Sequence, residues 1–378
     1  MSTVIAGYAR SPFTPAGRGA LARTRPDDIA ATVVNGLLQK LDIDPALVED
    51  IIVGTAFPEA EQGFNLARMI TFLTELPETV PGVTINRFCG SSMQAIHDAA
   101  GRIAMGAGEA FIAGGIESMS RIPMTGFNPM PNPKLAEEAP EALISMGITA
   151  ENLAVKYQID REAQEAFAIE SQARASAARE GGSFSEEIVP IETSDGIVDA
   201  DGCIRPDTDA ETLARLKPAF DSTGSVTAGT ASPLTDGAAF VLVCSDEFAK
   251  QHGLRPLARI VTTAVSGCAP EIMGIGPVEA TNKALERAGL TLDDIDIIEL
   301  NEAFAAQSLA VIEELGMDQS KVNIDGGAIA LGHPLGASGA RITGKAASLL
   351  QRSGAKRALA TMCVGGGQGI ATILERID

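Results

Sequence analysis

The sequence contains no tryptophan and only two tyrosines, and aromatic residues make up 4% of its 378 residues. A protein that stacks nucleic-acid bases on aromatic side chains needs more of them. Positive charge is also scarce, because 29 lysines and arginines stand against 49 aspartates and glutamates, for a formal net charge of −20. A basic binding face is therefore not expected, and we predict no nucleic-acid partner.

The sequence also lacks long apolar runs, paired cysteines and clustered histidines. No run reaches the ~18 apolar residues of a membrane helix, and the first residues carry no basic stretch followed by an apolar one. The cysteines are five, widely spaced and without a C-x-x-C pair: Cys89, Cys203, Cys244, Cys268 and Cys363. No two of the three histidines stand at ligand spacing. We therefore expect no membrane segment, signal peptide, disulfide framework or metal site, and a reducing, cytoplasmic location.

The sequence contains an internal repeat with an offset of 247 positions. The segments 48–57 and 295–304 both end in Ala-Phe, and each follows an amphipathic segment, at 28–41 and 278–288. Each copy therefore predicts a helix, a short turn and a buried strand. A repeat this long indicates two similar α/β halves rather than a solenoid.

Both halves alternate segments typical of strands and of helices, which favours an α/β class with a mainly parallel sheet covered by helices. Residues 121–229 differ, because they open with proline-rich loop chemistry and contain a charged helix at 160–181 without a counterpart in the second half. We interpret them as an inserted loop or cap domain over a site. We therefore predict three units. Residues 1–120 and 230–250 form the first half, residues 121–229 form the inserted domain, and residues 251–378 form the second half.

Cys89 follows an extended run and precedes a predicted helix that begins at Gly90, Ser91 and Ser92. Backbone N–H groups at a helix start favour the thiolate, so this position suits a nucleophile. The alternative is a buried structural cysteine.

Three further segments carry candidate chemistry. His333 lies in a glycine-rich loop before a second helix, where a rigid histidine suits a general base, or else caps a helix. Cys363 precedes three glycines from Gly365 on, whose amides could form an oxyanion hole or an anion site. Asn301 stands at the carboxyl end of a predicted strand, where open α/β sheets bind ligands.

Together these segments resemble the thiolase family, over nearly the whole chain. The matching stretches are N-E-A-F-A at 301–305, G-G-A-I-A-L-G-H-P-L-G-A-S-G-A-R at 326–341, C-V-G-G-G-Q-G-I-A at 363–371 and the segment 226–239. The stretch 86–100 is most similar to the thiolases of bacterial fatty-acid oxidation. In addition, Ser145 stands before Met146 and Gly147 where short-chain biosynthetic members commonly carry histidine.

The resemblance implies a five-layer αβαβα fold with two similar halves. It makes Cys89 the acyl-accepting nucleophile, His333 its activating base and Cys363 the second acid/base. The amides of Cys89 and Gly365 would form one oxyanion hole, and His333 with a water held by Asn301 would form another. The implied contacts of coenzyme A and the acyl chain are Arg205, Thr212, Ala228, Ser232, Phe304, Met146 and Met273.

The implied activity is the CoA-dependent cleavage of 3-ketoacyl-CoA in fatty-acid β-oxidation, through an acyl-enzyme and ping-pong kinetics. A biosynthetic condensation of two acetyl-CoA molecules is the nearest alternative. A decarboxylating ketoacyl synthase of the same fold is a further alternative, but it would lack the second cysteine, Cys363. A non-catalytic acyl-CoA-binding subunit would not need Cys89, His333, Cys363 and Asn301 together. We expect no permanently bound cofactor, and coenzyme A is a substrate. The resemblance also implies a homodimer or homotetramer. A hydratase/dehydrogenase subunit is a possible partner.

Overall fold

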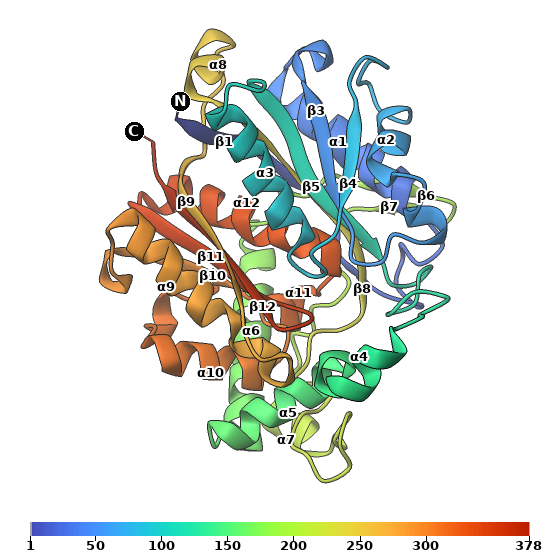
Figure 1. Cartoon of the computed structure of the whole chain (residues 1–378), viewed down its shortest axis with the longest axis vertical. Helices are drawn as coiled ribbons and strands as arrows, with labels where there is room; N and C mark the ends of the chain where they lie inside the picture. The colour runs from blue at the N-terminus through green and yellow to red at the C-terminus, as the bar shows by residue number, and fades with distance from the viewer. Residues whose placement is uncertain (1, 378) are drawn as a thin grey trace.

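The computed structural model describes residues 2–377, whose strands follow the continuous order β10-β11-β12-β9-β1-β8-β5-β3-β4 (Figure 1). The first half-sheet consists of β1 (Thr3–Arg10), β3 (Asp50–Gly54), β4 (Gly82–Ile85), β5 (Ala110–Ser118) and β8 (Thr235–Ser245). The second consists of β9 (Ala258–Gly267), β10 (Ile297–Leu300), β11 (Arg357–Val364) and β12 (Gln368–Glu375). The halves join where β1 pairs with β9 at Val4–Arg259 and Ile5–Ala258.

The helices repeat in the same way as the strands, which confirms the two similar halves. Helices α1 (Pro26–Leu41), α2 (Leu66–Thr71) and α3 (Ser91–Ala104) belong to the first half. Helices α9 (Gly276–Ala288), α10 (Ala305–Leu315) and α12 (Leu335–Ser353) are their counterparts in the second. The predicted helices at 28–41 and 278–288 are therefore α1 and α9.

Five layers follow from the way these helices bury their apolar faces. Helices α3 and α12 share one apolar core with residues from both half-sheets, so they form the central layer. Helices α1 and α2 cover the other face of the first half-sheet, and α9 covers the second, with Val311 and Ile312 of α10 in the same core. This is the αβαβα arrangement that the resemblance implied (Figure 1).

The prediction of a mainly parallel sheet was wrong, because the sheet is mixed. Parallel pairing joins β3 with β4, β3 with β5, and β10 with β11. Strands β8 and β12 return beside their neighbours in the opposite direction, so β8 is antiparallel to β1 and β5, and β12 to β9 and β11. A helical crossover favours parallel neighbours, but β12 follows β11 through a short turn that permits only antiparallel pairing.

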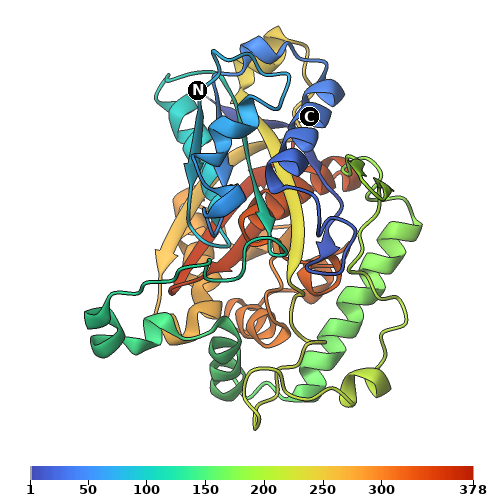
Figure 2. The ribbon, with the colours of Figure 1, turned by 90° about the vertical axis from the view of Figure 1, so that its right-hand side faces the viewer.

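The segment between β5 and β8 holds α4 (Pro133–Glu138), α5 (Met146–Lys156), α6 (Arg161–Glu180) and α7 (Ala210–Ala214). Figure 2 shows this green to yellow-green segment along one side of the molecule and below the half-sheets. It also contains the hairpin of β6 (Ile191–Thr193) and β7 (Gly196–Val198). The buried guanidinium of Arg10 anchors it to β1 through ion pairs with Glu187 and Asp201, each at 2.7 Å. The domain boundaries given above stay a prediction.

The remaining strand and α-helices of the described chain are short: β2 (Thr14–Pro15), α8 (Asp246–Gln251) and α11 (Ala328–Leu331). Among residues 2–377, no helix is both long and apolar enough to cross a membrane.

Candidate active site

Cys89 lies in the turn between β4 and α3, where the sequence placed it. Phe88, immediately before it, has a φ of 43°, so the chain reverses sharply ahead of the helix. The hydroxyl of Ser91 secures the turn, because it accepts the N–H of Arg87 at 2.8 Å and donates to the carbonyl of Phe88 at 2.6 Å. The turn therefore holds the thiol at the amino end of α3.

The Cys89 turn packs directly against the hairpin of β11 and β12. A Cβ added to Gly90 would come within 2.8 Å of the Val364 side chain and 3.1 Å of Ile370. The backbone N–H of Gly365 lies close enough to the sulfur of Cys89 to lower the pKa of the thiol. Cys363, two residues earlier on β11, is close enough for its charge state to interact with that of Cys89. The fold thus brings together two thiols that lie 274 positions apart.

His333 is held from three sides in the loop that precedes α12. Its backbone N–H donates to Oγ1 of Thr235 at 3.0 Å, and its Nδ1 lies 2.6 Å from Oγ of Ser338. Because the Ser338 hydroxyl donates to the carbonyl of Pro334, its oxygen accepts a hydrogen bond from the N–H at Nδ1. Nε2 then carries the lone pair, and the side-chain amide of Asn301 lies 3.4 Å from it. This tautomer leaves Nε2 free to act as a base.

Burial determines the protonation of all three reactive groups. It lowers the pKa of His333 to about 3, with a smaller contribution from the charge of Arg341. It raises the pKa of Cys89 to about 12, although the Gly365 N–H acts in the opposite direction. Burial also raises the pKa of Cys363, and interaction with Cys89 raises it further. At neutral pH the site therefore holds two neutral thiols and a neutral imidazole.

The backbone N–H groups at the start of the helix favour the Cys89 thiolate, as expected, but they do not keep the pKa of the buried thiol near its ordinary value. Donation by the backbone amides of Gly365 and of Cys89 itself stabilises the thiolate, but the loss of hydration outweighs it. Attack by Cys89 consequently requires a neighbouring group that accepts its proton.

Cys89, His333 and Cys363 line one apolar cavity of about 150 Å³. Four methionines contribute to its wall: Met119, Met124, Met146 and Met273. Phe220 and Phe304 meet edge to face in the same wall, with ring centres 5.7 Å apart. Flexible methionine side chains adapt to apolar groups of varied shape, so the cavity suits an acyl chain.

The cavity separates the seven expected CoA and acyl contacts into two groups. Met146, Met273, Ser232 and Phe304 line it. Arg205, Thr212 and Ala228 do not, and all three are exposed on the inserted segment. The geometry thus places four of these residues beside the thiols and three on the outer surface.

Glu117 is a buried carboxylate that the sequence analysis did not identify. It lies near the end of β5 and accepts the backbone N–H groups of Ala56 at 2.7 Å and Gly336 at 2.9 Å. Gln62 donates to it at 2.7 Å. It thereby joins the end of β3 to the start of α12 beneath the site. A single glutamate at a strand end gives no sequence signal of such a role, because its partners are distant backbone groups.

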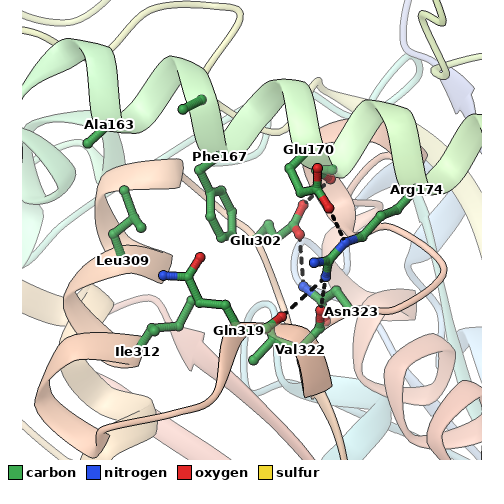
Figure 3. Close-up of a pocket in the computed structure, with 12 residues that line it drawn as sticks. Ala163, Phe167, Glu170, Arg174, Glu302, Leu309, Ile312, Gln319, Val322 and Asn323 are labelled. Atoms are coloured by element: carbon green, nitrogen blue, oxygen red, sulfur yellow. Dashed lines mark hydrogen bonds and ion pairs between the residues drawn. The ribbon is translucent and has the colours of Figure 1, made fainter.

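Glu302 performs a similar task in the second half, beside Asn301. Its carboxylate accepts from Ser171 at 2.7 Å, from Asn323 at 2.8 Å and from the backbone of Ile329 at 3.1 Å. Figure 3 shows it at the edge of a separate cavity of about 260 Å³ between α6 and α10, where neither Cys89 nor Cys363 lies. Glu302 therefore fixes the strand end from which Asn301 reaches His333.

Within residues 2–377, no group of three or more histidine, cysteine, aspartate or glutamate side chains is arranged to hold a metal ion. The five cysteines are free thiols.

Two family models together match almost the whole chain. The model described as the thiolase N-terminal domain matches residues 3–247, and that of the thiolase C-terminal domain matches residues 254–376. Among curated relatives, a 3-ketoacyl-CoA thiolase of Bacillus subtilis is 47% identical over 98% of both chains. One of Pseudoalteromonas translucida, with the same name, is 48% identical over 99% of both.

Solved structures agree with this similarity. Human mitochondrial 3-ketoacyl-CoA thiolase in complex with CoA has a TM-score of 0.92 and 40% identity, covering 100% of this chain and 98% of that one. An acetyl-CoA acetyltransferase of Bacillus anthracis has a TM-score of 0.91 and 41% identity, covering 100% and 99%.

Proposed function

The chain belongs to the thiolase family of acyltransferases, and we propose that it is a degradative 3-ketoacyl-CoA thiolase. It would use coenzyme A to cleave a 3-ketoacyl-CoA into acetyl-CoA and an acyl-CoA that is two carbons shorter. The observation that carries this proposal is that two thiols and an imidazole line the same apolar cavity.

In the proposed first half-reaction, Nε2 of His333 accepts the proton of Cys89 as the sulfur attacks the 3-keto carbon. The amides of Cys89 and Gly365 stabilise the resulting oxyanion. The bond between carbons 2 and 3 then breaks, and Cys363 donates its proton to the carbanion of the leaving acetyl-CoA. The carbanion's thioester oxygen is stabilised by His333 and by a water held by Asn301, whose buried Oδ1 has no hydrogen bond within the described chain.

In the second half-reaction the Cys363 thiolate takes the proton of an incoming coenzyme A. The CoA thiolate attacks the thioester on Cys89, the shortened acyl-CoA leaves, and the imidazolium of His333 returns a proton to Cys89. Both cysteines and the histidine thus return to their neutral resting state. This ping-pong sequence explains why the site holds two thiols whose pKa values are raised.

Coenzyme A would approach over the inserted segment, with Ser232 and Phe304 at the cavity mouth and Arg205, Thr212 and Ala228 along the outer surface. The acyl chain would extend past Met146 and Met273. No permanently bound cofactor takes part in this scheme, because thiols and an imidazole carry every proton and the acyl group.

The test is thiolysis across a chain-length series, with kcat/KM measured for acetoacetyl-CoA, 3-ketooctanoyl-CoA and 3-ketodecanoyl-CoA. Each methylene in an apolar wall contributes up to ~0.8 kcal/mol, so the longer pair should exceed acetoacetyl-CoA by about tenfold or more. A Cys89→Ala variant measures the background. Activity confined to acetoacetyl-CoA would contradict the degradative assignment.

A biosynthetic acetyl-CoA acetyltransferase is the second candidate, favoured by the similarity to the Bacillus anthracis enzyme of that name. It predicts that two acetyl-CoA molecules condense and that chains beyond four carbons are poor substrates. The same chain-length series separates the two functions.

We further propose that the protein is a cytoplasmic homodimer or homotetramer. Strand β4 ends the first half-sheet and leaves one edge unpaired in this chain, beside Phe64, whose surface is 91% exposed. A second copy is the simplest cover for this edge, and a hydratase/dehydrogenase subunit could join the assembly. Light scattering after size exclusion tests it, since a monomer at micromolar concentration would contradict the proposal.

A further inference from the structure

The proposed oxyanion hole depends on a loop made only of glycines. Residues 365–367 connect β11 to β12, and Gly366 and Gly367 have φ values of 77° and 78°. Glycine has no Cβ and therefore reaches a wider range of φ and ψ than other residues, so no side chain within the loop keeps the Gly365 amide directed at Cys89. Groups outside the loop must hold it.

One side chain anchors the loop at Gly365, through the carbonyl in the peptide unit that follows this amide. Gln368, the first residue of β12, donates from Nε2 to the carbonyl of Gly365 at 3.0 Å. This bond closes the hairpin loop across its base and restricts ψ of Gly365. Gln368 is itself held, because its Oε1 accepts a hydrogen bond from Nη1 of Arg87 at 2.9 Å.

Arg87 comes from the other half of the chain, two residues before Cys89. Its Nε donates to Oε1 of Gln94 at 2.7 Å, and Gln94 donates in turn to Asp98 at 2.7 Å. Among the described residues Arg87 makes no ion pair, so its partly buried charge is committed to two neutral amides. A guanidinium holds two planar acceptors in a fixed relative orientation, which a lysine cannot do.

We propose that Arg87 and Gln368 are positioning residues that hold the Gly365 amide in register with the Cys89 sulfur. Arg87 lies next to the nucleophile turn and Gln368 next to the glycine loop. The hydrogen bond between them therefore sets the distance between nucleophile and oxyanion donor across the two halves. This inference rests on the proposed function, because it assigns Gly365 to the oxyanion hole.

The experiment compares two reactions of Cys89. Acylation by acetyl-CoA passes through an oxyanion that the Gly365 amide must stabilise, whereas alkylation by iodoacetamide forms no oxyanion and depends on this amide only through its smaller effect on the pKa of Cys89. Removal of one oxyanion donor costs about 10²–10³-fold in rate, and a misdirected donor should cost a large part of that. Gln368→Ala should therefore slow acylation about 10–100-fold and change the alkylation rate by less than about threefold, with an unchanged melting temperature.

Gln368→Glu is the sharper variant. A carboxylate would pair more strongly with Arg87 but cannot donate to the Gly365 carbonyl, so acylation should be as slow as in Gln368→Ala. Arg87→Lys should be intermediate, because one amide contact survives. Gln351→Ala is the matched control, since Gln351 donates to a backbone carbonyl, that of Leu257, at 2.8 Å on the exposed surface of α12.

Wild-type acylation in both Gln368 variants would overturn the proposal. An equal fall of acylation and alkylation would also overturn it, because the nucleophile turn itself would then have moved. The proposed function is tested separately: if the wild-type protein is not acylated by acetyl-CoA, that function fails, whereas an acylated wild type with unaffected variants refutes only the positioning role.

Discussion

The side-chain amide nitrogen of Asn301 lies 3.4 Å from Nε2 of His333, and 32 positions separate the two residues. Asn301 immediately follows strand β10, and His333 lies in the loop before α12. Glu302 fixes the first position and Ser338 the second, so the pair keeps a constant spacing. Two separate backbone segments thus hold the amide of Asn301 beside the imidazole of His333, which lines the cavity.

Asn301→Ala should lower kcat for thiolysis by about 10²-fold, because the proposed water that completes the second oxyanion hole loses its anchor. KM for 3-ketoacyl-CoA should change little, since the binding walls remain. Steady-state kinetics measure both constants. A rise in KM with unchanged kcat would mean that Asn301 serves substrate binding instead.

Alkylation of Cys89 by iodoacetamide should accelerate steadily with pH in the resting enzyme. Burial raises the pKa of this thiol to about 12, so the thiolate fraction grows about tenfold per pH unit from pH 7 to pH 9. Mass spectrometry of the modified peptide follows the rate, with Cys89→Ser as the background. A rate that is already level near pH 7 would show a preformed thiolate.

Cys363→Ala should separate the two half-reactions. Acetyl-CoA should still acylate Cys89, because a CoA thiolate can leave without a proton, while thiolysis should fall by about 10²–10⁴-fold. The matched control is Cys268→Ala, a thiol close enough to influence Cys363 but absent from the cavity wall. Near wild-type thiolysis in Cys363→Ala would contradict the role of the second thiol.

Gly115→Ala should destabilise the fold by about 1–3 kcal/mol, because overpacking at a rigid contact carries that cost. A Cβ at this position in β5 would lie 2.1 Å from the carbonyl oxygen of Gly336 at the start of α12. Gly101→Ala in α3 is the control, since nothing lies within 4 Å of its added Cβ. It should stabilise the helix by about 0.5–1 kcal/mol. Equal melting temperatures of the two variants would refute the close contact.

His97→Gln should reduce the loss of stability at low pH. Nε2 of His97 lies 2.8 Å from Oγ1 of Thr372, and burial lowers the pKa of this histidine to about 3. Below pH ~6.5 the unfolded chain binds a proton at His97 that the folded chain does not. The free energy of unfolding therefore falls by up to ~1.4 kcal/mol for each pH unit that the pH is lowered. Urea unfolding at pH 7, 6 and 5 measures this slope. If the free energy of unfolding falls equally with pH in the wild type and in the variant, His97 does not contribute to the loss of stability.

Local sequence patterns were sufficient to predict much of the fold. The 247-residue repeat predicted two similar halves, and the helical periodicity at 28–41 and 278–288 predicted α1 and α9. The glycine-serine start after Cys89 predicted the turn before α3. Such features depend on neighbouring residues, so they are visible without the rest of the molecule.

Strand direction and protonation could not be predicted in this way. The direction of β8 and β12 follows from how distant segments pair, and an apolar run gives the same signal in a parallel or an antiparallel strand. The neutral state of Cys89 follows from burial between the two halves, which outweighs the helix start that the sequence displays. Glu117 accepts from a backbone group 219 positions away, and Gln368 is held by Arg87, 281 positions away, so neither residue gave a local signal. The sequence alone therefore sufficed for the elements and the reactive residue types. Their mutual distances and charge states arise only when the two halves pack and exclude water, because the contacts that join Cys89 to the Cys363 hairpin and remove water from the site run between the halves.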